Sequence, residues 1–181
     1  MTSFPISEFT NRITMYLPTA LSPNGKKLAY ISNITGAPQV WLGEINSKVD
    51  KLLFPTPITS EKEKSPNVFN SSLHFINDDT LAILKDTHGN EKTFIEIHHL
   101  KSGEIEIVPT DDGRDLINFT TKDKIFFTSN RGDGLSTGLY IYHLKNKKVE
   151  HIYTEKNAAL YWYNLELKKD DIEVNVVADL H

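Results

Sequence analysis

The chain has 181 residues, with 20 Lys and Arg against 24 Asp and Glu, so its formal net charge is −4. Hydrophobic residues make up 39% and charged residues 24%, a globular composition that excludes a disordered or fibrous chain. The acidic balance argues against binding to nucleic acid or to an anionic membrane. No apolar run approaches the roughly 18 residues of a membrane span, and the first residues lack the features of a signal peptide. Cysteine is absent, so we expect no disulfide, thiolate nucleophile or thiolate zinc site, and we expect a cytoplasmic protein.

One short helix and many short strands are predicted along the chain. The helix is expected over Ser7–Tyr16, with Ser7 as its N-cap. Runs rich in Ile, Val, Phe and Tyr then recur between Gly, Pro, Asn and Asp, which is typical of strands. The run Glu104–Ile107 alternates strictly between Glu and Ile, which predicts a strand with one buried face.

A unit of four predicted strands occurs three times. Leu28–Tyr30, Leu81–Ile83 and Ile125–Phe127 hold the same place in successive units, each after a polar turn. In the first turn, Pro23 presets φ and the Asn-Gly pair supplies the positive φ of a tight hairpin. Four strands per roughly 40–50 residues is the period of a β-propeller blade.

The predicted fold is therefore all-β, a partial β-propeller with about three full four-stranded blades and part of a fourth. The expected organisation is a leader at 1–20, blade 1 at 21–57, blade 2 at 72–111, blade 3 at 118–157 and a partial blade 4 at 158–181. An open arc of blades exposes apolar faces, so we expect self-association.

The alternative is a complete four-bladed ring. Its last blade would borrow a strand from Ile13–Thr19.

Two motifs resemble TolB-like propeller repeats. The segment Leu21–Tyr30 reads Leu-Ser-Pro-Asn-Gly-Lys-Lys-Leu-Ala-Tyr and is similar to the L-S-P-D-G-K-x-L-A-Y turn of those repeats. Ser129–Asp133, followed by Leu139 and Tyr140, resembles their S-N-R-x-G … L-Y stretch. Such repeats build the N-terminal propeller of the prolyl oligopeptidase family, especially its acylaminoacyl-peptidase and dipeptidyl-peptidase branches. The resemblance covers about residues 13–157.

The resemblance implies a propeller that sits over an α/β-hydrolase domain and admits short peptides to a Ser-Asp-His triad. This sequence contains no Gly-x-Ser-x-Gly elbow and no alternation of strands and helices, so the triad is expected outside the chain. The expected function is the non-catalytic propeller portion of a serine peptidase, which gates and positions short peptides. The alternative is a stand-alone TolB-like propeller that acts as a protein-interaction module. A third reading is a lactonase-like propeller enzyme with a metal in its channel.

The histidines do not form a recognisable metal motif. His98 and His99, adjacent in a strand, point to opposite faces and cannot chelate one metal together. His98 and His143 are interpreted as equivalent structural positions in repeats two and three. The seven histidines are His74, His88, His98, His99, His143, His151 and His181.

The other candidate sites are interpreted structurally. Asp111–Asp115 is dense in carboxylates, but it lies between two predicted blades and is expected to be an inter-blade turn. Arg131-Gly132-Asp133 spells an integrin-recognition tripeptide and is interpreted as a hairpin turn. Inter-blade packing is the role expected of the C-terminal aromatic residues Tyr140, Tyr142, Tyr153, Tyr161, Trp162 and Tyr163. We therefore predict no catalytic, cofactor-binding or metal-ligating residue in this chain.

Overall fold

The computed structural model describes residues 15–46, 51–60, 66, 72–86, 92–111, 113–132, 134, 136–154, 161–168 and 171–178. Blade 1 consists of β1 (Met15–Leu21), β2 (Lys27–Ser32), β3 (Gln39–Asn46) and β4 (Lys51–Pro57). Blade 2 consists of β5 (Leu73–Asn77), β6 (Thr80–Asp86), β7 (Thr93–His99) and β8 (Ile105–Ile107). Blade 3 consists of β9 (Asp115–Thr120), β10 (Lys124–Ser129), β11 (Gly138–His143) and β12 (Lys148–Thr154). A last hairpin consists of β13 (Tyr161–Lys168) and β14 (Asp171–Ala178).

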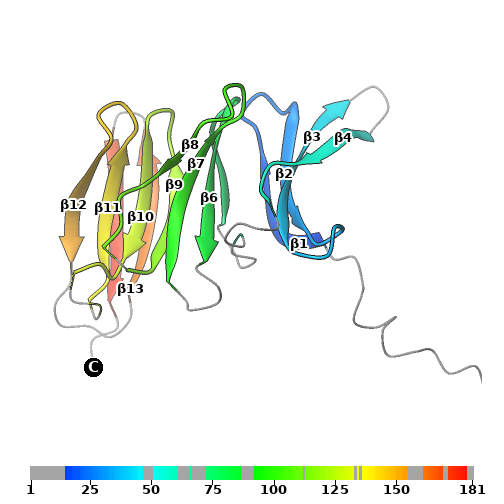
Figure 1. Ribbon diagram of the computed structural model, residues 1–181. Coiled ribbons are helices and arrows are strands. Elements are labelled where there is room, and N and C mark those ends of the chain that lie inside the picture. Colours follow the sequence, from blue (N-terminus) through cyan, green and yellow to red (C-terminus); the bar gives the residue numbers. More distant parts are fainter. Residues whose placement is uncertain are drawn as a thin grey trace, which may run out of the picture.

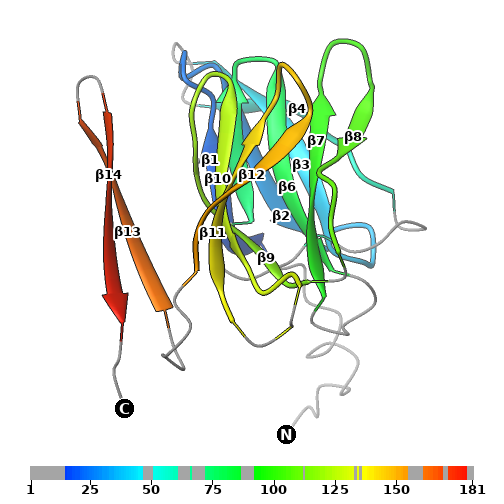
Figure 2. The same ribbon diagram turned by 90° about the vertical axis from the view of Figure 1, so that its left-hand side faces the viewer.

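Each blade is an antiparallel meander in which consecutive strands pair (Figure 1). The first strands of the blades, β1, β5 and β9, are neighbours, so the sheets stand side by side around a common inner edge. Figure 2 shows β13 and β14 as a two-stranded ribbon beside blade 3. The prediction of an all-β fold built from four-stranded propeller blades is confirmed.

The position of strand β1 tests two expectations about the N-terminal region. Met15 and Tyr16 belong to this strand, so the predicted helix is wrong at these two residues, and Ser7 to Thr14 lie outside the described residues. The partner of β1 is β2, with Thr19 opposite Tyr30 and Leu21 opposite Leu28. β1 is the inner strand of blade 1. The alternative of a four-bladed ring, in which residues of Ile13–Thr19 complete the last blade, is therefore also wrong.

Two apolar layers hold the three blades together. Ala29, Ile31 and Val40 of blade 1 pack against Leu81 and Ile83 of blade 2. The opposite face of blade 2 packs against blade 3 in a second layer, whose members include Ala82, Leu84, Ile95, Ile97, Ile125, Phe127 and Tyr142. Alternate residues of β6 therefore serve two different interfaces, as the period of two in a strand requires.

The other face of blade 1 is apolar and open within the described part of the chain. Leu28 and Tyr30 alternate with Ala29 and Ile31 along β2, so they lie on the face away from blade 2. On the same face Leu21 is 57% exposed, whereas Leu81, which holds the place of Leu28 in blade 2, is 0% exposed. This surface is shaped to receive a neighbouring sheet.

The strand β8 reverses the burial that its alternating sequence suggests. Ile105 and Ile107 are 46% and 55% exposed, while Glu106 is half-buried. β8 is the outer edge strand of blade 2, and Glu106 turns toward blade 3, where Tyr142 and Lys147 bind it. Ion pairing across the blades, rather than hydrophobic patterning, orients this strand.

No helix among the described residues is long and apolar enough to cross a membrane.

Candidate functional site

The turns at one end of the blades form the candidate functional surface, which we call the upper turn surface. It comprises residues 22–26, 78–79, 100–104, 121–123 and 144–147, which connect β1 to β2, β5 to β6, β7 to β8, β9 to β10 and β11 to β12. All five turns lie at the top of Figure 1 because strands alternate in direction within each blade. Among the described residues, no group of three or more His, Asp and Glu could hold a metal ion.

The first of these turns is built by its own side chains. The Ser22 hydroxyl donates to Asn24 Oδ1 at 2.9 Å and accepts from the Lys27 amide at 2.9 Å. Asn24 Oδ1 also accepts from the Lys26 amide at 2.9 Å. Gly25 adopts φ +70°, which a residue without Cβ reaches without strain. The Ser-Pro-Asn-Gly motif thus fixes the direction in which Lys27 leaves the turn.

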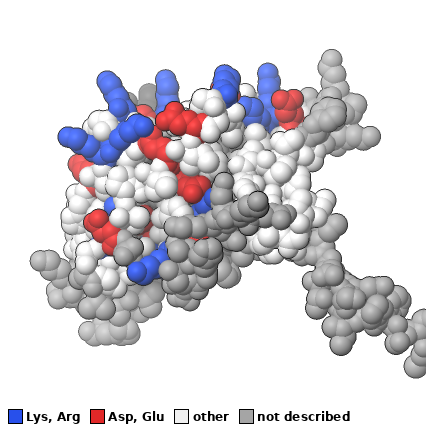
Figure 3. All heavy atoms as spheres, in the orientation of Figure 1, with Lys and Arg blue, Asp and Glu red and all other residues white. Residues whose placement is uncertain are grey.

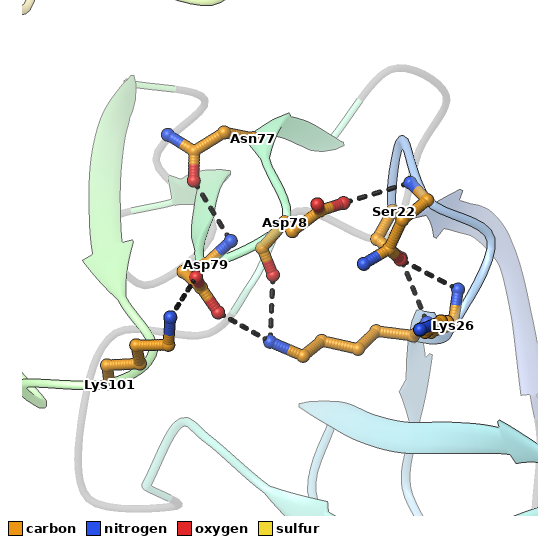
Figure 4. A network of polar contacts seen from close by, with 8 residues as sticks. Ser22, Lys26, Asn77, Asp78, Asp79 and Lys101 are labelled. Carbon is orange, nitrogen blue, oxygen red and sulfur yellow. Dashed lines mark hydrogen bonds and ion pairs between the residues drawn. The ribbon is translucent and has the colours of Figure 1, made fainter.

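Lys27 connects blade 1 to blade 2 through its bonds to Asp78 and Asp79, two residues labelled in Figure 4. Its Nζ lies 2.8 Å from the Asp78 carbonyl oxygen and 2.8 Å from Asp79 Oδ1. Lys101 Nζ reaches Asp79 Oδ2 at 2.6 Å, and the Asn24 amide donates to Asp78 Oδ1 at 2.9 Å. Both oxygens of the Asp79 carboxylate are therefore engaged by lysines.

The ion pair between Asp79 and Lys101 shifts the pKa values of these two groups in opposite directions. Hydrogen bonds from Lys101 and Lys27 lower the pKa of Asp79, and the bond to Asp79 raises the pKa of Lys101. Both groups thus keep their charges at neutral pH. The network acts as a surface link between blades and has no group poised for proton transfer.

A second link joins blade 2 to blade 3 at the same end. Glu106 Oε2 lies 2.7 Å from Lys147 Nζ, and Glu106 accepts a hydrogen bond from the Tyr142 hydroxyl. Burial alone would raise the pKa of Glu106, but the bonds from Lys147 and Tyr142 hold it below its usual value. Burial and the Glu106 carboxylate raise the pKa of Tyr142, so its hydroxyl stays protonated.

The Ser129-Asn130-Arg131 motif forms a clamp at the opposite end of blade 3. Both Nη2 contacts of Arg131 to the Asp115 carboxylate are 3.0 Å, and Asp115 is completely buried. The guanidinium carbon lies 4.8 Å from the Phe127 ring centre and 5.0 Å from that of Tyr140. Burial raises the pKa of the Asp115 carboxyl, while Arg131 opposes that effect.

This clamp accounts for two candidate sites. Asp111, Gly113 and Arg114 lie between β8 and β9, so the prediction of an inter-blade turn is confirmed for them, whereas Asp115 is the first residue of β9. Arg131 and Gly132 lie in the turn between β10 and β11, and the Arg131 side chain is only 8% exposed. The predicted hairpin turn is confirmed for Arg131 and Gly132, and the Arg131 guanidinium is committed to Asp115; Asp133 lies outside the described residues.

A buried charged cluster faces blade 1 from blade 2. Lys85 Nζ lies 3.1 Å from Glu96 Oε2, and His98 Nε2 lies 3.0 Å from the same oxygen. The Lys85 side chain is 1% exposed. Burial would raise the pKa of Glu96, but His98 and Lys85 together lower it. Ion pairing thus compensates the burial of a charge.

The strand register corrects one interpretation of the histidines. His98 lies opposite Leu81, and Tyr142 lies opposite Ile125, so His98 and Tyr142 are equivalent. His143 is equivalent to His99, because His99 lies opposite Thr80 and His143 lies opposite Lys124, the residues that precede Leu81 and Ile125.

Each described histidine has a structural setting. Nε2 of His143 is 2.7 Å from Glu150 Oε2, and Nε2 of His151 is 2.7 Å from the Thr154 hydroxyl. His74 is half-buried in β5, while His88 and His181 lie outside the described residues.

The aromatic prediction is confirmed in part. Tyr142 is buried in the layer between blades 2 and 3, and Tyr140 packs against that layer. Tyr153, in contrast, is 38% exposed on β12. Tyr161, Trp162 and Tyr163 belong to β13, and their side chains lie outside the described part of the structure.

Lysine side chains gather along the upper turn surface, as the upper rim of the molecule in Figure 3 shows. Sequence reasoning missed this feature, together with the Lys27–Asp79 link and the Lys85–Glu96 pair. The lysines are spread over turns that are distant in sequence, and only the stacking of blades brings those turns together. A count of Lys in each predicted turn would have been the one available signal. The exposed members are Lys26, Lys101, Lys122, Lys145 and Lys147.

A shallow hollow on blade 1 is lined by Lys27, Leu42, Gly43, Glu44 and Thr56. Lys27 is already bound to Asp79 there, so this hollow offers no free reactive group from that residue.

Comparison with known proteins identifies the fold. No protein-family model matches the chain, and no curated protein matches it in sequence. Solved structures are nevertheless similar over most of its length. TolB from Acinetobacter baumannii matches 92% of this chain with a TM-score of 0.60 and 19% identity. The β-propeller domain of the Trilobed protease from Pyrococcus furiosus matches 91% with a TM-score of 0.60 and 11% identity. A puromycin hydrolase matches 90% with a TM-score of 0.59 and 8% identity.

The chain spans 41% of the TolB chain, 49% of the Trilobed protease domain and 26% of the puromycin hydrolase. At these identities the similarity establishes the architecture and not the activity. The chain has a β-propeller fold that is similar to those of TolB, the Trilobed protease domain and puromycin hydrolase.

Proposed function

We propose that this chain is the non-catalytic propeller portion of a serine peptidase of the prolyl oligopeptidase family. Its role is to gate and position short peptides for a Ser-Asp-His hydrolase domain outside the chain. The supporting observation is the match of about nine-tenths of the chain to the Trilobed protease propeller and to puromycin hydrolase. A cytoplasmic location and short peptides as partners belong to the same proposal.

The buried and half-buried acidic side chains are occupied by ion pairs, which supports a structural role for them. Within the described residues, Asp79 binds Lys27 of blade 1 and Glu106 binds Lys147 of blade 3. Asp115 binds Arg131 of its own blade. Glu96 binds Lys85 and His98. These pairs stiffen a stack of sheets, which is what a rigid partition beside an active site needs.

The test compares two preparations. The purified 181-residue chain is incubated with short fluorogenic peptides, and the native product is immunoprecipitated from source cells and assayed with the same peptides. We expect no cleavage by the chain and cleavage by the native product that a serine-directed fluorophosphonate abolishes. Cleavage by the pure chain, or a native product that is inert toward both peptide and label, would contradict the proposal.

A second candidate is a TolB-like propeller that acts as a protein-interaction module. It is favoured by the identity to TolB, 19%, against 8% and 11% for puromycin hydrolase and the Trilobed protease propeller. In this case the immunoprecipitate contains a stoichiometric non-covalent partner and no band that reacts with fluorophosphonate.

A further inference from the structure

The upper end of blade 3 carries a concentrated positive charge on a net acidic protein. Lys122 lies in the turn from β9 to β10, and Lys145 lies in the turn from β11 to β12. Between them, Lys124, His143 and Lys148 are direct cross-strand partners on β10, β11 and β12. We call these five residues the blade 3 basic surface.

The row of three lies on one face of the sheet. Ile125 and Tyr142, the next residues inward, pack toward blade 2, so Lys124, His143 and Lys148 lie on the opposite face. Lys124 and Lys148 flank His143 on this face, and His143 binds Glu150, so among the described residues the two lysines have no carboxylate partner of their own.

Two of the nearby carboxylates already bind other side chains. Glu106 binds Lys147 and Tyr142, and Glu150 lies 2.7 Å from His143. Asp123 accepts a hydrogen bond from the Thr121 hydroxyl at 3.3 Å. In the part of the chain that the structure describes, Lys122, Lys124, Lys145 and Lys148 form no ion pair. Four ammonium groups are therefore available to a ligand.

We propose that the blade 3 basic surface is a docking site for an acidic segment of a partner polypeptide. A polypeptide fits better than a nucleic acid because the whole chain has net charge −4 and would repel a polyanion outside this patch. An acidic peptide contacts the patch through a few carboxylates and needs no wider basic surface. The inference is independent of the peptidase proposal, because either kind of propeller can use such a surface.

The test is fluorescence anisotropy with a labelled oligoglutamate peptide at low and moderate salt. Oligoglutamine of the same length is the neutral probe, and single-stranded oligothymidylate is the nucleic-acid probe. We expect oligoglutamate to bind and oligoglutamine not to bind. The double variant Lys145→Gln/Lys148→Gln should weaken binding about fivefold, since each exposed ion pair contributes only modestly. Salt should weaken binding as well.

The matched control is Lys92→Gln/Arg114→Gln, which removes two exposed positive charges from the other end of the blades. It should bind oligoglutamate like the parent chain. Thermal melting of both double variants checks that each remains folded, and Lys122→Gln gives a third, turn-located substitution with the same expected direction. Equal weakening by the two doubles, equal binding of oligoglutamine, or tighter binding of oligothymidylate would each overturn the proposal.

Discussion

Arg131 joins several parts of blade 3 through one guanidinium group. It binds the Asp115 carboxylate, donates to the Pro109 carbonyl oxygen at 2.9 Å and lies over the stacked rings of Phe127 and Tyr140. A planar, delocalised cation suits all three contacts, which an ammonium group does not. The residue that looks most like a recognition motif in the sequence is therefore the one most committed to the fold.

Replacing Arg131 should be among the most damaging single changes in the chain. Arg131→Ala leaves the buried Asp115 carboxylate without its counter-charge, and we expect the free energy of unfolding to fall by about 3–5 kcal/mol. Arg131→Lys keeps the charge but loses the fork geometry, so its loss should be intermediate. Urea unfolding measures both changes.

Arg114→Ala is the control, because its side chain is exposed beside the same turn; it should change stability by less than about 0.5 kcal/mol. If Arg131→Ala cost no more than this control, the clamp would have no role in stability.

Glu96 should make stability depend on pH. Its pKa is lowered in the folded protein, so its contribution is fully present above the unfolded-state pKa of about 4.3. That contribution is lost as pH falls through the lower, folded-state pKa. Glu96→Gln leaves Lys85 buried without a carboxylate and should cost about 3 kcal/mol at neutral pH.

The measurement is the difference in unfolding free energy between parent and Glu96→Gln across an acid titration. The difference should shrink toward zero at pH values below the folded-state pKa, where Glu96 is also uncharged. The exposed Glu104→Gln serves as the control and should show almost no difference at any pH. A Glu96→Gln deficit that persisted unchanged into strong acid would contradict the ion-pair account.

Between elements, apolar layers and surface ion pairs both join the blades, but with different strengths. Leu81 is completely buried against blade 1, whereas Asp79 and Lys101 are exposed by 34% and 80% of their side chains. Burial of a leucine stabilises by a few kcal/mol, while exposed ion pairs contribute about 0–1 kcal/mol. The polar network of Figure 4 therefore contributes little to the free energy of unfolding. Its main effect is to orient the turns of blades 1 and 2 relative to each other.

Two substitutions on neighbouring positions of blade 2 separate these contributions. We expect Leu81→Ala to lower the unfolding free energy by about 2–5 kcal/mol, because it leaves a cavity between the blades. Asp79→Asn should lower it by less than about 1 kcal/mol, and raised salt should reduce even that loss. Denaturant unfolding of the two variants compares them directly. A larger loss for Asp79→Asn than for Leu81→Ala would reverse this ranking.

The same elements show how far sequence reasoning reaches. The repeat, the turn chemistry of Ser22–Gly25 and the four-stranded blades were predictable because they depend on residues close together in the chain. The orientation of β8 was not, since Glu106 is drawn inward by Lys147 and Tyr142 of the next blade. The one-residue misalignment of His98 with His143 could have been avoided from the sequence, because the separation of Leu81 and His98 equals that of Ile125 and Tyr142. Contacts between blades are long-range, and no local pattern encodes them.

At the scale of the whole molecule, the open face of blade 1 is the most consequential feature. Met15 and Leu21 are 60% and 57% exposed on a face whose other members, Leu28 and Tyr30, are half-buried. In blade 2 the positions of Leu28 and Tyr30 are filled by Leu81 and Ile83, which pack against the preceding blade. An apolar sheet face of this kind associates with another sheet when one is present.

The isolated chain should therefore self-associate. Sedimentation velocity should show oligomers that grow with concentration, and Leu21→Lys should shift the distribution toward monomer because it places a charge on the open face. The control Ile34→Lys alters a residue of similar exposure, 53%, in the turn between β2 and β3 at the other end of the blade. It should leave the oligomers unchanged. A parent chain that stays monomeric at all concentrations would show that the face needs no partner.

The most direct test of the central claim is the mass of the native gene product. An antibody raised against this chain is used to blot a denaturing gel of source cells, alongside a fluorophosphonate label. A propeller portion of a serine peptidase predicts a labelled band several times heavier than 20.6 kDa. An unlabelled band at 20.6 kDa would contradict the peptidase account and leave a small propeller-fold binding module.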